Sequence, residues 1–505
     1  MQNYDYMVVG SGITGLTAAR ILGQHGQRVL LLEKAPVVGG SLTRFRAGGI
    51  PFDVGFHFTG GFLADGTGML DEMLALLGIR ERIRPEFYTR EACHRMIFSS
   101  LGVDYAMPCG TEALRASLER DFPGQRAGLE RYFARHRAVV AATPTLKVSG
   151  FSTNPGLIDD DHVTLQAVLD EYFSDPLLQT LLGCWCLCYG TPPKEVSFAT
   201  HCRVSFALQE SLARVEDGGD AFVAALVDAL RGDRVEIRTG TTIRECADIV
   251  ERKVRRFVLS DGTEVGVRGC ILTIHPRNIL ELLPEAHVSK AFRHRIEDFA
   301  PSNGFFAVYG AVEEPVGAEL SSLTAILPDP DLNKLLTPQT PEPEEGAMSV
   351  LRCRERGPAG LVDAVTVLEV AFPETTARWA DSQLGRRPAA YEAYKAQRQQ
   401  SIEARTTRHM PECRGMRTLA SASLLTFRDY LNSPDGSAYG IRQKVGQFNV
   451  SGRLPLTNLF AAGQSALLPG VIEGMTSAFL VCRSILGMDV FRQYLARRLS
   501  CSSVL

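Results

Sequence analysis

The residues best placed to do chemistry lie within the first forty positions of the chain. Three glycines in a Gly-x-Gly-x-x-Gly pattern directly follow the apolar run 6–9, and a helical pattern follows them. A glycine lets the backbone turn sharply and approach a pyrophosphate, and the helix N-terminus offers unpaired N–H groups to phosphate oxygens. The pattern predicts a site for an adenine dinucleotide. The residues expected in this turn are Gly10, Gly12, Ile13, Thr14 and Gly15.

An acidic residue follows the next strand at the spacing that such a site requires. The apolar run 29–32 ends in Glu33, whose carboxylate can accept hydrogen bonds from the adenosine ribose, and Lys34 stands beside it. A second glycine pair, Gly39 and Gly40, comes next with Ser41. Plain nicotinamide dehydrogenases do not need this pair. The run resembles that of FAD enzymes of the glutathione-reductase and amine-oxidase type, which implies FAD as the cofactor.

The C-terminal part of the chain carries a second candidate element for the same cofactor. The run 459–464 is typical of a strand that ends in glycine, and residues 469–474 open an apolar helix that continues to residue 486. Backbone N–H groups at such a helix start can face an electron-rich ligand. The alternative is an ordinary strand–helix packing unit. The further residues expected at the cofactor are Ile243, Gly463, Gln464, Gly470, Val471 and Ile472.

These motifs require a sheet whose strands come from distant parts of the chain. We predict an α/β fold in which a Rossmann-like FAD-binding domain is interleaved with an α+β substrate domain built on a second sheet. The FAD-binding domain is assigned to residues 1–80, 195–283 and 445–490. The substrate domain is assigned to residues 81–194 and 284–444, and residues 491–505 form a C-terminal tail.

The amino-acid composition limits the kinds of molecule that this protein is expected to bind. The chain has 505 residues, of which 45% are hydrophobic and 22% charged, and its net charge is -3, so we expect a globular protein that does not bind nucleic acid. No signal peptide or membrane-spanning run is expected, and the twelve cysteines indicate reduced thiols in the cytosol. The cluster of Cys184, Cys186 and Cys188 lacks a second ligand pair, so core packing is favoured over a metal site.

Several motifs together resemble one enzyme family. The runs 39–45 and 52–58 resemble the phytoene desaturase superfamily and are most similar to the branch with retinol saturase and carotenoid isomerase. The runs 189–193, 426–430, 436–440 and 458–464 are similar to later motifs of that family, so the resemblance covers nearly the whole chain. It implies hydride chemistry at a carbon–carbon double bond of a hydrophobic polyene or isoprenoid. Gln464 stands where phytoene desaturases tend to carry an acid, so saturation, desaturation and isomerisation all stay open.

Four side chains are candidates for catalysis. His57 stands in a Gly-x-His pattern like that of the saturase branch and could donate a proton, and Glu473 at the start of the last helix could reach the flavin. Tyr189 and Tyr439 could line the substrate pocket. For each of them a structural role is the alternative, because an acid in a first helical turn is favourable without any chemistry.

Other functions and contacts stay open beside this interpretation. An amine oxidase or protoporphyrinogen-oxidase-like enzyme shares the FAD architecture, and a non-catalytic flavin- or lipid-binding protein is a second alternative. The electron donor or acceptor is not identified by any motif. The C-terminal run 490–499 could form a basic amphipathic helix on a membrane surface or a helix docked on the core, so the expected location is the cytoplasm with or without membrane association.

Overall fold

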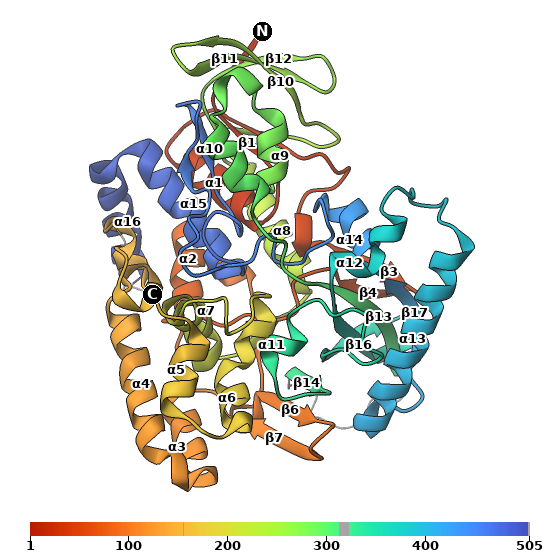
Figure 1. Cartoon of the computed structure of the whole chain (residues 1–505). Coiled ribbons are helices and arrows are strands. Elements are labelled where there is room, and N and C mark those ends of the chain that lie inside the picture. The colour runs from red at the N-terminus through yellow and green to blue at the C-terminus, as the bar shows by residue number, and fades with distance from the viewer. Residues whose placement is uncertain (155, 313–322, 503–505) are drawn as a thin grey trace.

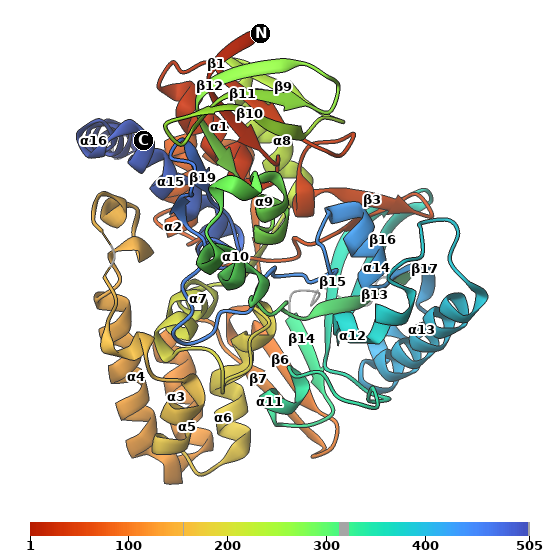
Figure 2. The same cartoon turned by 45° about the horizontal axis from the view of Figure 1, so that its top comes forward.

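Two β-sheets organise the chain. The computed structural model describes residues 1–154, 156–312 and 323–502. A largely parallel sheet lies at the top of Figure 1, and a second sheet lies below it beside a lobe of helices, an arrangement that is also visible in Figure 2. The remaining strands form two short two-stranded ribbons. They pair β3 (Arg44–Ala47) with β4 (Ile50–Asp53), and β5 (Pro85–Phe87) with β8 (Ala213–Val215).

The first sheet has a core of parallel strands in the order β9-β2-β1-β12-β19. An antiparallel hairpin, β10–β11, continues the sheet beyond β12, and β18 pairs with β19. The strands are β1 (Gln2–Val9), β2 (Val29–Leu32), β9 (Val235–Arg238), β10 (Ile243–Val250), β11 (Lys253–Leu259), β12 (Glu264–Leu272), β18 (Gly452–Arg453) and β19 (Leu459–Ala461).

Alternating residues of these strands build two separate cores, because successive side chains of a strand point to opposite faces. Val8 and Leu31 pack with one set of helices, whereas Met7 and Leu30 face the other side of the sheet. The first set is α1 (Ile13–Gln24), α2 (Met69–Leu77), α8 (Gly218–Leu230), α15 (Val471–Leu486) and α16 (Met488–Ser502). The other face is covered by α9 (Pro276–Leu282) and α10 (Lys290–Glu297).

The second sheet is mixed and has the strand order β17-β13-β16-β15-β14-β6-β7. Its pairs are antiparallel except for β14 and β6, which run parallel. The strands are β6 (His94–Phe98), β7 (Val103–Met107), β13 (Gly304–Val312), β14 (Leu323–Leu327), β15 (Met348–Gly357), β16 (Gly360–Ala371) and β17 (Arg417–Ala422).

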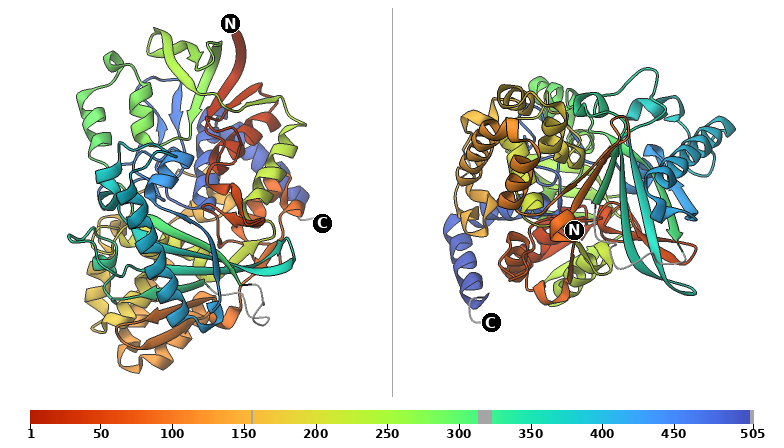
Figure 3. Two further views of the ribbon diagram at one scale, coloured as in Figure 1. Left: turned by 90° about the vertical axis from the view of Figure 1, so that its right-hand side faces the viewer. Right: turned by 90° about the horizontal axis from the view of Figure 1, so that it is seen from below.

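Helices cover both faces of this sheet as well, as the view from below shows (Figure 3). Phe306 and Val308 pack with Ile402 of the long helix α13 (Ala389–His409). Ala307 and Tyr309 face the helical lobe and join the largest core of the molecule. That lobe contains α3 (Thr111–Asp121), α4 (Arg126–Ala141), α5 (Leu165–Tyr172), α6 (Pro176–Gly183) and α7 (Phe198–Glu210). The remaining short helices are α11 (Leu332–Leu335), α12 (Pro373–Thr376) and α14 (Leu424–Leu431).

The α/β class predicted from the sequence is confirmed, with a parallel Rossmann-like sheet and a second sheet. The first sheet draws its strands from residues 2–32, 235–272 and 452–461, and the second from 94–107, 304–371 and 417–422. The exact domain boundaries stay a prediction. Within the described ranges, no helix is both long and apolar enough to cross a membrane.

The C-terminal helix uses its apolar face inside the protein. Phe491, Tyr494 and Leu495 of α16 are buried in the same core as α1, α2 and α15. The Tyr494 hydroxyl donates to Gln24 Oε1 at 2.9 Å. Of the two interpretations of this helix, the structure therefore favours docking on the core, and the proposed membrane contact gains no support from these three side chains.

Candidate functional site

The glycine turn lies where the parallel strands end. Gly10 follows β1 with a φ of 99°, a conformation that side chains rarely adopt. Thr273, just after β12, donates its hydroxyl to the carbonyl oxygens of Val9 at 2.9 Å and Gly10 at 3.2 Å, which fixes the turn. A Cβ on Gly15 would lie 1.8 Å from the Gly10 carbonyl oxygen, so only glycine lets α1 approach the strand this closely. Ligands of such sheets bind outside the carboxyl ends of the strands.

The two glycine segments of the N-terminal region touch one another. Gly40 lies so close to the turn that its Cβ would be 3.3 Å from Gly12 Cα, and the Gly39 N–H donates to Ser11 Oγ at 3.1 Å. Gly12 itself faces open space, because nothing lies within 4 Å of the position that its Cβ would take. The backbone thus forms a cradle with room at Gly12, and its shape and N–H groups fit a pyrophosphate.

Glu33 is held at the edge of this cradle by the turn itself. Its Oε2 accepts hydrogen bonds from the backbone N–H and the hydroxyl of Ser11, at 2.9 and 2.6 Å, and its Oε1 accepts from the Ala35 N–H at 2.8 Å. A carboxylate offers about four acceptor positions. These three bonds orient the group and leave acceptor capacity, and the contact of Glu33 with a ribose hydroxyl stays a prediction.

The closing segment of the chain lies against the opening turn. Gly463, which follows β19, donates its N–H to Ser477 Oγ of α15 at 2.9 Å. A Cβ on Gly474 would meet Ile13 Cγ2 and Thr14 Oγ1 at 3.0 Å each, so the first turns of α15 and α1 lie side by side. Two helix N-termini with partial positive charge therefore face the same region.

Other residues predicted at the cofactor lie at different positions. Gln464 is exposed beside the turn, and its Nε2 is 3.6 Å from the position of a Cβ on Gly440. Ser41 is exposed and packs against Gly55. The Lys34 ammonium instead donates to Asn432 Oδ1 at 2.8 Å, and the Ile243 side chain is buried in the core between the sheet and α9.

Glu473 lies in the first turn of α15, which begins with Val471 and Ile472 directly after Gly470. Its Oε2 would be 2.1 Å from a Cβ on Gly470, so the carboxyl folds back over that glycine. Although part of the side chain reaches solvent, the dense protein around the carboxyl raises its pKa to about 8. At neutral pH this group therefore carries a proton.

His57 lines a small pocket between the β3–β4 ribbon and the second sheet. Burial and the nearby Arg214 guanidinium lower the pKa of the imidazole to about 4, so His57 is neutral at physiological pH. The residues around the pocket are Phe52, Asp53, His57, Tyr88, Arg214, Leu351, Arg352, Cys353 and Thr366.

Beside this pocket lies a buried network of four charges that the sequence did not indicate. Glu355 of β15 accepts from Arg44 Nη2 at 2.5 Å and also pairs with Arg214 Nη2. Asp53 of β4 lies 3.3 Å from Arg44 Nε and accepts from the Gly219 N–H at 3.1 Å. Arg44 and Glu355 also line a solvent-open pocket of about 640 Å³ on the other side. The network separates the two pockets and ties the ribbon to the second sheet.

Removing one member of the network leaves a buried charge without compensation. We expect Glu355→Ala to lower the free energy of unfolding by about 3–5 kcal/mol, because Arg44 and Arg214 both lose a carboxylate. Urea or thermal unfolding measures the loss. Glu216→Ala breaks the exposed pair with Arg84 and serves as the control, with an expected change of less than about 1 kcal/mol. Equal losses in the two variants contradict the prediction.

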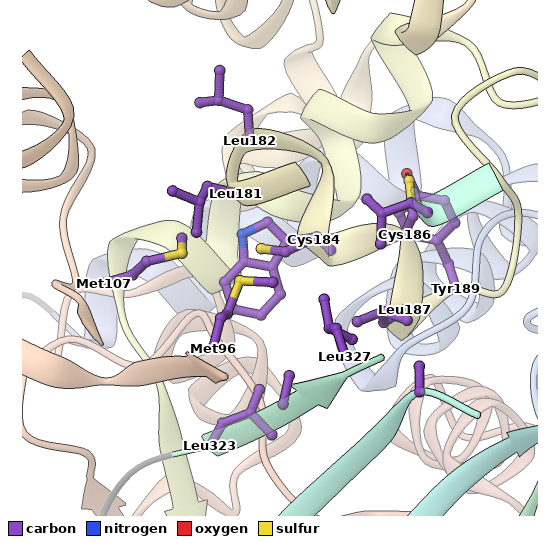
Figure 4. Packing of buried hydrophobic residues seen from close by; sticks show 14 of the residues in the cluster. Met96, Met107, Leu181, Leu182, Cys184, Cys186, Leu187, Tyr189, Leu323 and Leu327 are labelled. Atoms are coloured by element: carbon purple, nitrogen blue, oxygen red, sulfur yellow. Dashed lines mark hydrogen bonds between the residues drawn. The ribbon is translucent and has the colours of Figure 1, made fainter. Parts of the chain in front are cut away.

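The two tyrosine candidates are held by other groups. Tyr189 is fully buried, and its hydroxyl lies 2.8 Å from His201 Nδ1 and 2.9 Å from Cys186 Sγ. Figure 4 shows Tyr189 and Cys186 together within the largest hydrophobic core. Tyr439 donates its hydroxyl to the Leu187 carbonyl oxygen at 3.1 Å. These contacts favour structural roles, although Tyr439 stands next to Gly440 and hence close to Gln464.

Comparisons with known proteins agree over most of the chain. Residues 8–67 match the model of the NAD(P)-binding Rossmann-like domain. Human all-trans-retinol 13,14-reductase is 22% identical over 97% of this chain and 87% of its own length. Prolycopene isomerase from Daucus carota is 30% identical over 29% of this chain and 23% of its own.

Solved structures share the fold. A redesigned putrescine oxidase superposes with a TM-score of 0.65 at 14% identity, covering 96% of this chain and 99% of its own. An oxidoreductase from Methanosarcina mazei reaches a TM-score of 0.62 at 15% identity, covering 95% and 99%. Together with the cradle described above, these similarities support a relationship to the superfamily of flavin oxidoreductases that includes the retinol saturases and carotenoid isomerases.

Proposed function

We propose that this protein is an FAD-dependent oxidoreductase that acts on carbon–carbon double bonds of a hydrophobic polyene or isoprenoid. The observation that carries the proposal is the end-to-end similarity to all-trans-retinol 13,14-reductase, together with a glycine cradle formed jointly by the two ends of the chain. The similarity to a prolycopene isomerase supports the same substrate class. An electron donor or acceptor outside the chain completes any reaction with net electron flow.

The proposed cofactor has a defined set of protein contacts. FAD supplies hydride transfer, while the protein binds and orients it and keeps the reacting centre dry. In this proposal the N–H groups of the opening turn hold the pyrophosphate, and Glu33 accepts from the ribose. The first turn of α15 would direct its partial positive charge to the flavin ring.

Addition of hydrogen to a double bond needs a proton as well as a hydride. Of the two candidates for proton transfer, Glu473 keeps a proton at neutral pH, because its pKa is about 8. His57 is deprotonated above about pH 4 and can only accept a proton or orient a neighbouring group. We therefore assign proton donation to the Glu473 carboxyl and orientation of the bound substrate to His57.

A panel of polyenes tests the function. Purified protein, once with reduced and once with oxidised flavin, is incubated with retinoids and carotenes, and product mass and absorbance are recorded. A mass gain of two hydrogens identifies saturation, a loss of two identifies desaturation, and a changed spectrum at constant mass identifies isomerisation. A protein that yields none of these products with a fully reducible flavin contradicts the proposal.

One alternative has some support from the fold. Because the fold is similar to that of putrescine oxidase, an amine oxidase activity is the alternative to test. That alternative predicts hydrogen peroxide release with amines, which a coupled peroxidase assay detects. The two tryptophans give no support to an amine-binding site, because Trp185 packs against His94 in the core and Trp379 packs against Tyr391.

The second alternative is a non-catalytic flavin carrier. Its flavin would bleach with dithionite and would never reoxidise with any acceptor or lipid.

We expect His57→Ala to lower kcat by about 10-fold or more while FAD stays bound, because the proposal gives His57 a role in orienting the substrate and its pocket contains no residue of the glycine cradle. Turnover with the active polyene and the flavin-to-protein absorbance ratio measure the two effects. His25→Ala, on the far end of α1, is the matched control. Unchanged turnover in His57→Ala removes this residue from the mechanism.

A further inference from the structure

Two cysteines flank the β6–β7 hairpin at the edge of the second sheet. Cys93 directly precedes β6, and Cys109 follows β7 by two residues; the first pair of the hairpin joins His94 to Met107. The Cys93 thiol donates to the Met107 carbonyl oxygen at 3.6 Å, and the Cys93 and Cys109 side chains interact with one another. The Cys109 N–H in turn donates to the Arg90 carbonyl oxygen at 2.7 Å, which holds the second cysteine in place.

The surroundings of the two sulfurs differ. The interactions of the Cys109 sulfur with Cys93, with the Leu212 backbone and with the Arg90 charge lower its pKa, although burial and the charge of Glu210 oppose this shift. The hydrogen bond to Cys109 and burial raise the pKa of the Cys93 thiol. Burial also raises the pKa values of the other described cysteines, for example those of Cys202 and Cys246.

We propose that Cys93 and Cys109 are a redox modification site, at which hydrogen peroxide converts the two neighbouring thiols into a disulfide. The Cys109 thiolate attacks one peroxide oxygen, the O–O bond breaks, and hydroxide leaves, so that Cys109 becomes a sulfenic acid. The Cys93 sulfur then attacks the Cys109 sulfur, the S–S bond forms, the S–O bond breaks, and water leaves. Two thiols are oxidised by two electrons, and one peroxide is reduced to two waters. The site does not depend on the proposed flavin chemistry.

The position of the hairpin explains how peroxide reaches two buried sulfurs. Cys93 is 2% exposed and Cys109 is 4% exposed. However, β7 is the outermost strand of its sheet and pairs only with β6 among the described strands. Edge elements open locally at a lower free energy than the sheet interior. Met96 of β6 and Met107 of β7, labelled in Figure 4, pack in the same hydrophobic core as the two cysteines.

Peptide mapping of the full chain tests the proposal. The protein is treated with graded hydrogen peroxide, free thiols are blocked with N-ethylmaleimide, and the protein is digested without reductant for mass spectrometry. We expect a Cys93–Cys109 cross-linked peptide that disappears on reduction. Cys246 and Cys270 are neighbouring buried thiols whose pKa values are both raised, and they serve as the internal control. Absence of the 93–109 peptide, or its formation only together with a 246–270 peptide, overturns the proposal.

Variants separate the two chemical steps. In Cys93→Ser the sulfenic acid on Cys109 has no resolving thiol, so dimedone should label Cys109 after peroxide treatment, while Cys246→Ser should leave the 93–109 cross-link unchanged. Arg90→Gln removes the positive charge near Cys109 and should slow cross-linking severalfold. Absence of dimedone labelling on Cys109 in folded Cys93→Ser protein contradicts the proposed order of steps.

Discussion

Gly12→Val should give a folded protein that no longer retains its flavin. Gly12 has φ and ψ of -67° and -177°, which any residue adopts, and no atom lies within 4 Å of the position of its Cβ. A valine therefore fits the apoprotein but occupies the space proposed for the pyrophosphate. We expect FAD affinity to fall at least about 100-fold, which corresponds to about 3 kcal/mol. Flavin absorbance after gel filtration and titration of the apoprotein with FAD measure the change.

A matched glycine separates this effect from a general loss of stability. Gly124 also has open space around its Cβ position but lies in the helical lobe, far along the chain from the cradle. Gly124→Val should keep the yellow colour and the unfolding temperature of the parent protein. Retention of FAD by Gly12→Val would place the cofactor elsewhere and remove the basis of the proposed function.

Glu473→Gln should remove the proton donor and change the pH dependence of turnover. The carboxyl is protonated below its pKa of about 8, so the activity of the parent protein should fall as the pH rises through that value. The glutamine keeps the shape of the side chain but cannot donate a proton as an acid. We expect kcat to fall by about 10²- to 10⁴-fold and the alkaline limb near pH 8 to disappear. The pH profile of kcat with the active polyene measures both effects.

The matched control is an acid in the first turn of another helix. Glu112 opens α3, and Glu112→Gln changes the same chemical group without approaching the cradle. It should leave kcat and the pH profile unchanged. If Glu473→Gln keeps the parent kcat and the alkaline limb, Glu473 only stabilises the N-terminus of α15 and another group donates the proton.

The Rossmann-like half of the fold could be predicted from the sequence because its signals are local. The turn 10–15, the strand 29–32 and Glu33 lie within one short βαβ unit, so their spacing along the chain sets their spacing in space. The run 459–464 and the helix after it were also identifiable, because the strand and helix are continuous. Their contact with the opening turn through Gly474 and Thr14 was only implied by resemblance.

The neighbourhood of the candidate catalytic groups could not be predicted in the same way. Arg44 and Glu355 are 311 residues apart, and Arg214 and Glu355 are 141 apart, yet all three meet with Asp53 in one network. No pattern in the sequence marks these residues as partners. Tyr189 was a candidate for the substrate pocket, but its position in the chain did not reveal the buried contacts with His201 and Cys186.

The amino-acid sequence by itself determined the glycine cradle, the acid at its edge and the helix that closes it, because backbone conformation and helix polarity follow from neighbouring residues. Only the tertiary structure decided which titratable groups hold a proton. Burial raises the pKa of Glu473, which favours proton donation, whereas burial and the nearby Arg214 charge lower the pKa of His57, which prevents it. Those shifts depend on desolvation and on charges brought together from distant segments, and neither is encoded in local spacing.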